Sequence, residues 1–331
     1  MQEKKEGWGE DSNPILYTNN DTVLTGVFDG MGGAGGAECE SDFSHDGIHM
    51  TKAYVGSRIV RDAIEKAIQE NPTLLFFQHL SEELESIIAC RYTEEKKKYP
   101  AKSKAGLRSS LIKEYPTTLA MTCVNQTAKG YEIKSLWAGD SRNYLWKKEG
   151  LFQISIDDLK GNLDPMQNLR EDAPMSNCIQ ADAPFRINYR DIILEAKEKF
   201  IVISATDGCF GYYPSPMDFE KVLAETLEMS NSIQDFKECL TSKFAVVTAD
   251  DFSFAIAAIG FKDFTDMKKS LSPSNRKVKE YFNKRNYYEG KLKKFEEKIE
   301  HLKKGVNQEM MALWPEYKDS YLKFMESYER R

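Results

Sequence analysis

Strongly apolar, strand-like segments of this chain repeatedly end or begin at an aspartate. Asp29, Asp140 and Asp207 each close such a segment, and each is followed at once by glycine or serine. Asp250 and Asp251 stand directly before the apolar run FSFAIAA. A carboxylate at the mouth of a buried strand costs free energy unless its charge is offset. One such residue is an ordinary turn, whereas the repetition indicates that several strand ends meet and bring their charges together.

Converging carboxylates repel one another, and hard divalent cations are the usual remedy in proteins. Oxygen ligands favour Mg²⁺, Mn²⁺ or Ca²⁺ over Zn²⁺. The 6 cysteines are scattered without a CxxC pair, and the 4 histidines include one closely spaced pair, His45 and His49. Because two ligands do not make a zinc site, the sequence predicts a centre for an oxygen-binding cation. Asp11, in the GEDS sequence near the N-terminus, is a further acidic residue of this kind.

The first 260 residues alternate between helix-like and strand-like patterns. Apolar residues recur at helical spacing in Gly47–Gln69 and Leu74–Ile88, and later in Met217–Met229 and Ile233–Phe244. Short segments rich in β-branched and apolar residues predict strands at 21–28, 117–124, 131–138, 143–146, 191–194, 200–205 and 252–261. Residues 157–183 are polar and contain prolines, which predicts a long irregular segment of the kind that often has a functional role.

The chain changes character after residue 262, where lysine, glutamate and aromatic residues dominate. Apolar residues recur at alternating steps of three and four from Val278 to Val306, a heptad pattern that only Arg285 interrupts. A second apolar pattern extends to Tyr328 and predicts that a second helix folds back. We therefore expect a helical hairpin in residues 263–331. It either packs on its own body or uses residues 278–328 to bind a protein partner or a second copy.

Composition excludes several classes of protein. The net charge is −6, without the basic excess that nucleic-acid binding would suggest. No segment approaches the roughly 20 apolar residues needed to span a bilayer, and the charged N-terminus does not resemble a signal peptide. The scattered cysteines are typical of reduced thiols. We expect a soluble, cytoplasmic protein with neither a nucleic-acid nor a membrane partner.

Six short motifs occur in an order that is more specific than any one of them. They are GEDS (9–12), GVFDGMGG (26–33), TTLA (117–120), WAGDSR (137–142), ISATDG (203–208) and ADDFS (249–253). In this order and spacing they resemble the motifs of the PPM-type (type 2C) metal-dependent serine/threonine protein phosphatases, and the DGMGG form looks like bacterial members. The resemblance covers about residues 7–261.

The resemblance implies an α+β fold: a four-layer α-β-β-α sandwich of two antiparallel sheets flanked by helix pairs, here in residues 1–262, with the helical appendage after it. It places a flap that contacts substrates at 157–183. It also implies two Mn²⁺ or Mg²⁺ ions per active site and a third, weaker ion. Asp29, Asp207 and Asp250 are the implied catalytic residues. The implied metal-binding residues are Glu10, Asp11, Asp29, Gly30, Asp140, Asp207 and Asp250.

Three positions depart from the family pattern. Glu6 stands where the family has an arginine that grips the substrate phosphate, so Lys4 or Lys5 would have to supply that charge. Gly211 replaces an acidic residue found in many relatives, which bears on the third ion. Asp251 replaces a usual asparagine and adds negative charge.

The expected function is phosphoprotein phosphatase activity on phosphoserine or phosphothreonine, in which two cations activate a water that attacks phosphorus. The absence of a CxxxxxR loop agrees with a mechanism without a covalent protein nucleophile. The alternative is a catalytically weak pseudophosphatase that acts as a binding or regulatory module through its helical tail.

Overall fold

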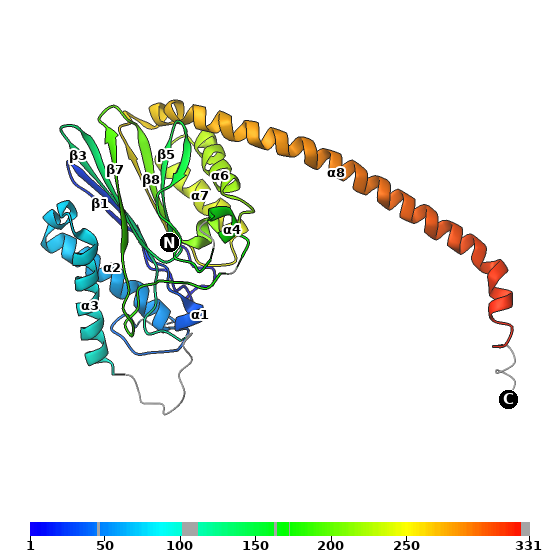
Figure 1. Cartoon of the computed structure of the whole chain (residues 1–331), viewed down its shortest axis with the longest axis horizontal. Coiled ribbons are helices and arrows are strands. Elements are labelled where there is room, and N and C mark those ends of the chain that lie inside the picture. The colour runs from blue at the N-terminus through cyan, green and yellow to red at the C-terminus, as the bar shows by residue number, and fades with distance from the viewer. Residues whose placement is uncertain (45–46, 101–111, 162–163, 172, 326–331) are drawn as a thin grey trace. The chain divides into compact units, whose positions relative to one another are not determined.

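Two antiparallel sheets lie face to face in the first of two units, residues 1–278; the second unit is 279–331. The structure is a computed structural model that describes residues 1–44, 47–100, 112–161, 164–171 and 173–325. In Figure 1, α2 and α3 lie on one side of the strands, and α6 and α7 lie on the other. The predicted four-layer α-β-β-α sandwich is confirmed.

The sheets combine strands that are far apart in sequence. One sheet has the order β1 (Ile15–Thr18), β2 (Thr22–Val27), β3 (Leu119–Thr127), β4 (Gly130–Ala138) and β7 (Asn188–Glu195). The other has the order β6 (Gly150–Gln153), β5 (Arg142–Lys147), β8 (Phe200–Ala205) and β9 (Phe254–Ile259). All strand pairs are antiparallel. The short strands β1 and β6 were not predicted.

The helices are α1 (Gly32–Gly35), α2 (Lys52–Glu70), the 3-10 turn η1 (Pro72–Phe76), α3 (Leu80–Lys98), α4 (Pro165–Asn168), α5 (Asp207–Phe210), α6 (Pro216–Met229), α7 (Ile233–Val247) and α8 (Phe264–Tyr321). The predicted start of α2 at Gly47 is too early. Gly47 has φ +83°, which is not helical, and Thr51 caps the helix by accepting a hydrogen bond from the Tyr54 amide at 3.0 Å.

Three apolar clusters account for the layers. The first joins α2 and α3 to the outer face of the β1–β7 sheet, and the second joins α6, α7 and the start of α8 to the β6–β9 sheet. The third lies between the sheets and includes Val124, Ile133, Phe200 and Val202. Burial of these side chains is the main favourable contribution to the fold.

A buried polar network also ties the two sheets together. The Thr25 and Ser204 hydroxyls lie 2.9 Å apart, and the Ser204 hydroxyl donates to Asn143 Oδ1 at 2.8 Å. Asn143 Nδ2 donates to the Leu136 carbonyl at 2.8 Å and to Ser135 Oγ at 3.1 Å. Because each group has a partner, the network costs little desolvation energy and fixes how one sheet faces the other.

The segment predicted to be irregular is irregular in its described residues, apart from the four-residue helix α4. Asp158 anchors it: its carboxylate accepts hydrogen bonds from the Gly139 amide at 3.1 Å and from Asn177 Nδ2 at 2.6 Å. The side-chain amide of Asn188 donates to the same carboxylate, with Nδ2 3.0 Å from Oδ1. The segment is therefore held against the strand ends that carry the aspartates.

The C-terminal part differs from the prediction. Phe264–Tyr321 is one helix, α8, so the predicted hairpin with a returning second helix is wrong. The predicted boundary at residue 262 is also too early, because the start of α8 packs in the first unit. There, Trp146 Nε1 donates to Ser274 Oγ at 3.0 Å, and Ser274 Oγ donates to Glu220 at 3.0 Å.

A search of the described helices finds none that combines the length and the apolar character needed to cross a lipid bilayer.

Gly56 offers a test of the packing between α2 and the chain that leads into β3. A Cβ at this position would overlap the carbonyl oxygen of Tyr115, a backbone atom that cannot easily move. We expect Gly56→Ala to lower the free energy of unfolding by about 1–3 kcal/mol, measured by thermal or urea denaturation. Gly290→Ala on α8 is the matched control, because nothing lies within 4 Å of a Cβ there. An unchanged stability of Gly56→Ala would contradict the packing described.

Candidate metal centre

Asp29 is positioned by the end of β2 and the start of β3. Its backbone carbonyl accepts hydrogen bonds from the Thr118 amide at 2.8 Å and the Thr117 hydroxyl at 2.6 Å. Gly30 then forms an isolated bridge with Thr117. The TTLA motif therefore fixes the backbone of the aspartate in the DGMGG motif.

Asp207 lies at the end of β8, in the opposite sheet, and Thr206 connects it to two other motifs. The Thr206 hydroxyl donates to Asp11 Oδ2 at 2.9 Å and accepts from the Ser253 amide at 2.9 Å. The Ser253 hydroxyl donates to the Ser12 carbonyl at 3.2 Å. The GEDS, ISATDG and ADDFS motifs thus meet through short neutral hydrogen bonds.

The carboxylates that the sequence predicted to converge do influence one another. Burial raises the pKa of Asp29 well above its usual range, and the charges of Asp11, Asp207, Asp140 and Asp250 raise it further. Burial likewise raises the pKa of Asp11 well above its usual range. The charge of Asp207 also raises the pKa of Asp11, so Asp11, Asp29 and Asp207 lie close enough to repel one another. Asp29 is therefore the centre of the acidic cluster.

The outer members of the cluster are shifted in the same direction. Burial raises the pKa of Asp140 to about 7, with further contributions from Asp207 and Asp157. Burial, followed by the charge of Asp250, raises the pKa of Asp207. Partial burial also raises the pKa of Asp250 and of Glu10. In the described part of the chain, none of the ion pairs includes these carboxylates, and the charge of Arg142 lowers the pKa of Asp140 and Asp207 only as a smaller effect.

The side chains are close together without forming a completed coordination shell. Among the residues that the structure describes, no three histidine, cysteine, aspartate or glutamate side chains are arranged to hold a metal ion. Asp11 instead accepts a hydrogen bond from the Thr206 hydroxyl, and Glu10 accepts one from the Thr51 hydroxyl. The all-oxygen chemistry of the clustered carboxylates and their mutual repulsion fit hard divalent cations.

Two glycines of the DGMGG motif make room for Glu10. A Cβ on Gly30 would lie 2.6 Å from the Glu10 carbonyl oxygen, and a Cβ on Gly32 would overlap Glu10 Oε2. The other carboxylate oxygen, Oε1, accepts a hydrogen bond from the Thr51 hydroxyl at 2.5 Å. The glycines therefore allow the GEDS segment to lie directly on the DGMGG turn.

Asp251 has a role that the sequence did not predict. Its two oxygens accept hydrogen bonds from the backbone amides of Lys4, at 2.8 Å, and Glu10, at 2.7 Å. Gln2 and Phe252 form an isolated antiparallel bridge beside it. Asp251 thus holds the N-terminal segment beside the clustered carboxylates. Its role is more than adding negative charge to the site.

Arg58 on α2 is a second contributor that sequence analysis missed. Its guanidinium donates to the carbonyls of Glu10 at 3.2 Å and Asp11 at 3.0 Å, and it lies 3.3 Å from the Tyr54 ring centroid. Its position on the polar edge of an amphipathic helix did not indicate this role, because its contacts are with residues far away in the sequence.

The lysines predicted to bind phosphate make other contacts. Lys4 Nζ donates to the Thr248 carbonyl at 2.7 Å, and Lys5 Nζ lies 3.5 Å from the Trp8 ring centroid. Trp8 in turn stacks on His49 at 4.0 Å. Glu6 is exposed. A role for either lysine in binding the substrate phosphate stays a prediction.

Arg142, in the WAGDSR motif, is buried in a bidentate ion pair. Its Nε and Nη2 donate to the two oxygens of Asp157 at 2.9 and 2.6 Å. The ion pair joins the start of β5 to the segment that follows β6. Because its charge is matched by Asp157, Arg142 lowers the pKa of neighbouring Asp140 and Asp207 only as a lesser effect than their burial.

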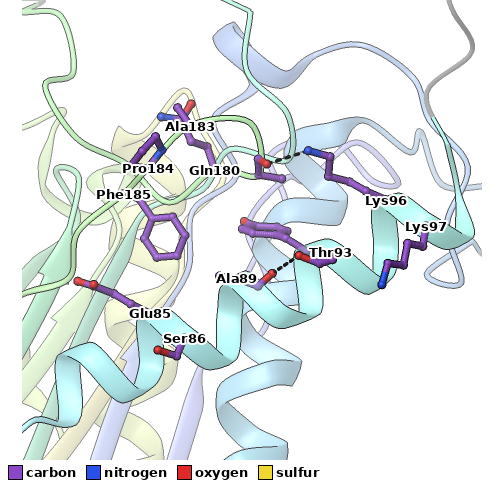
Figure 2. Close-up of a pocket in the computed structure, with 12 residues that line it drawn as sticks. Glu85, Ser86, Ala89, Thr93, Lys96, Lys97, Gln180, Ala183, Pro184 and Phe185 are labelled. Atoms are coloured by element: carbon purple, nitrogen blue, oxygen red, sulfur yellow. Dashed lines mark hydrogen bonds between the residues drawn. The ribbon is translucent and has the colours of Figure 1, made fainter.

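A hollow between a helix and the irregular segment lies apart from these carboxylates. It has a volume of about 580 Å³ and separates α3 from residues 180–185; none of the clustered carboxylates lines it. Figure 2 shows Phe185 and Glu85 near one end, and Lys96 donating to a backbone carbonyl near the other; that acceptor is Ala181, at 3.0 Å. This hollow is therefore not part of the candidate metal centre.

The raised pKa of Asp140 predicts a pH-dependent stability. Its carboxyl is protonated more readily in the fold than in the unfolded chain, so ionisation destabilises the fold as pH rises from about 4 to about 7. With chelator present, Asp140→Asn should raise Tm at pH 8 by about 5 °C and much less at pH 5, measured by calorimetry. Asp191→Asn, at an exposed site on β7, is the control. Equal changes for Asp140→Asn at both pH values would contradict the assignment.

The fold has clear counterparts among solved structures. No protein-family model matches the chain, and no curated protein matches it in sequence. A bacterial serine phosphatase structure superposes with a TM-score of 0.53 at 18% identity, covering 76% of this chain and 92% of that one. The serine/threonine phosphatase Stp1 from Staphylococcus aureus gives a TM-score of 0.53 at 17% identity, with 76% and 89% covered. The resemblance predicted from the ordered motifs is confirmed in three dimensions: this chain has the fold of the bacterial PPM-type serine/threonine phosphatases.

Proposed function

We propose that this chain is a metal-dependent serine/threonine protein phosphatase that hydrolyses phosphomonoesters. The observation that supports it is the burial of Asp29 close enough to Asp11 and Asp207 for their charges to raise its pKa. These three acids come from the N-terminal segment and from the ends of strands in opposite sheets. No arginine or lysine of the described residues forms an ion pair with them, so their charge calls for cations.

The proposal assigns Mn²⁺ or Mg²⁺ to this cluster, two ions per site. When bound, such ions lower the pKa of a water so that it can attack phosphorus, and they stabilise the phosphoryl oxygens. Asp29 would bind both ions, with the Gly30 carbonyl on one. Asp207 and Asp250 would bind the other, and Glu10 and Asp11 would support the site. Asp140, together with Asp207, would hold a third, weaker ion.

The chain's own residues orient the ligands. The Thr206 hydroxyl fixes one oxygen of Asp11. Asp251 and Arg58 fix the backbone of Glu10 from two sides. Burial raises the pKa of the Cys209 thiol, beside the cluster, well above the usual range, which disfavours the thiolate that a covalent mechanism would need. This supports attack by water instead of a covalent intermediate.

The substrate side of the proposal rests on fewer observations. A phosphoserine or phosphothreonine protein is the proposed substrate, and the cytoplasm is the proposed location. Lys4 or Lys5 would contact the phosphate, which requires Lys4 Nζ to leave the Thr248 carbonyl or Lys5 to leave the Trp8 ring. A lysine offers a point charge, in contrast to the two-pronged donor of an arginine.

Activity tests the proposal directly. The purified chain should hydrolyse p-nitrophenyl phosphate and a phosphothreonine peptide with Mn²⁺ and lose this activity with chelator. Asp29→Asn removes the central ligand and should lower kcat/KM at least about 100-fold, equivalent to roughly 2.7 kcal/mol.

The matched control is Asp191→Asn, which makes the same chemical change on an exposed strand. It should retain full activity and the same melting curve. If no phosphomonoester is turned over with either ion, or if Asp29→Asn is as active as the control, the catalytic proposal fails.

The second candidate is a catalytically weak pseudophosphatase that binds partners through its tail. Glu6 and Gly211 favour it, because the positions of the phosphate-gripping arginine and of an additional acid are both altered. Calorimetric titration separates the two functions. Two Mn²⁺ sites together with turnover support the enzyme, whereas no Mn²⁺ binding at millimolar concentration supports the pseudophosphatase.

A further inference from the structure

The second unit carries a continuous line of exposed apolar side chains. The six that recur in 288–306 are each between 51% and 68% exposed. They are Tyr288, Leu292, Phe295, Ile299, Leu302 and Val306. Large apolar groups exposed in a contiguous row are unusual on a monomeric soluble protein and mark an interaction surface.

The spacing of this row identifies the kind of partner. Its steps alternate between three and four residues, so Leu292, Ile299 and Val306 occupy position a of a heptad, and Tyr288, Phe295 and Leu302 occupy position d. α8 is one uninterrupted helix through the whole row. A narrow 3.5-residue seam on a straight helix fits another helix lying alongside it, whereas packing on a globular body requires a wider apolar face.

The charged residues beside the seam distinguish between possible helical partners. Position g holds Lys284, Lys291 and Lys298, and position e holds Glu289, Glu296 and Lys303. In a parallel, in-register pair of this helix, each g residue faces the e residue five positions later on the other copy. Lys284 then faces Glu289, and Lys291 faces Glu296. Only Lys298 faces a like charge, on Lys303.

An antiparallel pair of the same helix is disfavoured by the same residues. In that arrangement g residues face g residues, and all three are lysines. The core positions agree with two strands, because Ile299 and Val306 are β-branched at position a and Leu302 is at position d. At Val306 two steps of four residues follow one another, from Leu302 to Val306 and from Val306 to Met310, so the regular heptad phase ends there.

We propose that residues 284–306 of α8 pair with the same residues of a second copy of this chain as a parallel, in-register, two-stranded coiled coil. The two copies bury the apolar a and d side chains of 288–306 against each other, after the charged Arg285 at the preceding position a. They align two lysine–glutamate pairs on each side of the seam. The proposal is independent of phosphatase activity, since it concerns only the second unit.

The mass of the full chain in solution is the first test. Analytical ultracentrifugation at micromolar concentration should show a dimer. Ile299→Glu/Leu302→Glu places charge in the seam and should give a monomer. The matched control, Asn307→Glu/Gln308→Glu, adds the same charge on the outer face of the helix and should remain dimeric. A wild-type monomer up to about 100 μM, or identical masses for both variants, overturns the proposal.

A pair of charge reversals tests the parallel orientation. Lys298→Glu converts the repulsion with Lys303 into attraction and should lower the dimer Kd about threefold to tenfold, whereas Lys291→Glu sets two glutamates opposite each other and should raise it by a similar factor. Both variants change the net charge equally. An antiparallel dimer would be tightened by both, so tighter dimerisation of Lys291→Glu overturns the parallel arrangement, as would the absence of any effect.

Discussion

The mutual repulsion of Asp11, Asp29 and Asp207 is the constraint on which the arrangement of the first unit depends. Buried carboxylates would move apart or gain counter-charges if the surrounding structure allowed it. Here they are held by neutral groups: the Thr117 hydroxyl donates to the backbone carbonyl of Asp29, and the Thr206 hydroxyl donates to the carboxylate of Asp11. The nearby arginines do not neutralise them. Arg142 pairs with Asp157, and Arg58 donates to backbone carbonyls. The fold therefore maintains negative charge that a bound cation can offset.

The position of this charge follows from the two-sheet architecture. Asp29 follows β2 in one sheet and Asp207 follows β8 in the other. The cluster therefore forms only when the two sheets pack in the observed position relative to each other. The buried network through Thr25, Ser204 and Asn143 fixes this relative position of the sheets with directional hydrogen bonds, which apolar packing alone does not provide. Asp251 then closes the site by holding the N-terminal segment. Structural hydrogen bonds and the candidate catalytic acids are thus parts of one connected assembly.

The order of motifs and the apolar strands predicted the sandwich and the acidic cluster, because each strand end carries its aspartate as a local signal. The roles of Asp251 and Arg58 were not predictable, since each depends on contacts across the fold that leave no local pattern. The tail was mispredicted for a different reason. Gly305 and Pro315 are residues that often end a helix, but α8 continues through both. A glycine costs a helix only about 1 kcal/mol and a proline about 3 kcal/mol, which a long helix can tolerate. The polar residues Ser274 and Asn275, beyond the predicted boundary at residue 262, make buried contacts with β5 and α6.

The two units present the same physical problem in different forms. In the first, buried carboxylates accumulate charge that the chain itself does not compensate. In the second, a helix displays apolar side chains that the rest of its own unit does not cover. Such features are unfavourable for an isolated chain, and each has a residue pattern that specifies what would relieve it. All-oxygen ligands around Asp29 select a hard cation, whereas the heptad with lysine at g and glutamate at e selects a copy of itself. The cation requirement depends on three-dimensional convergence, while the helix pairing depends on local spacing alone. The two proposals therefore stand on independent observations, and the loss of either one leaves the other intact.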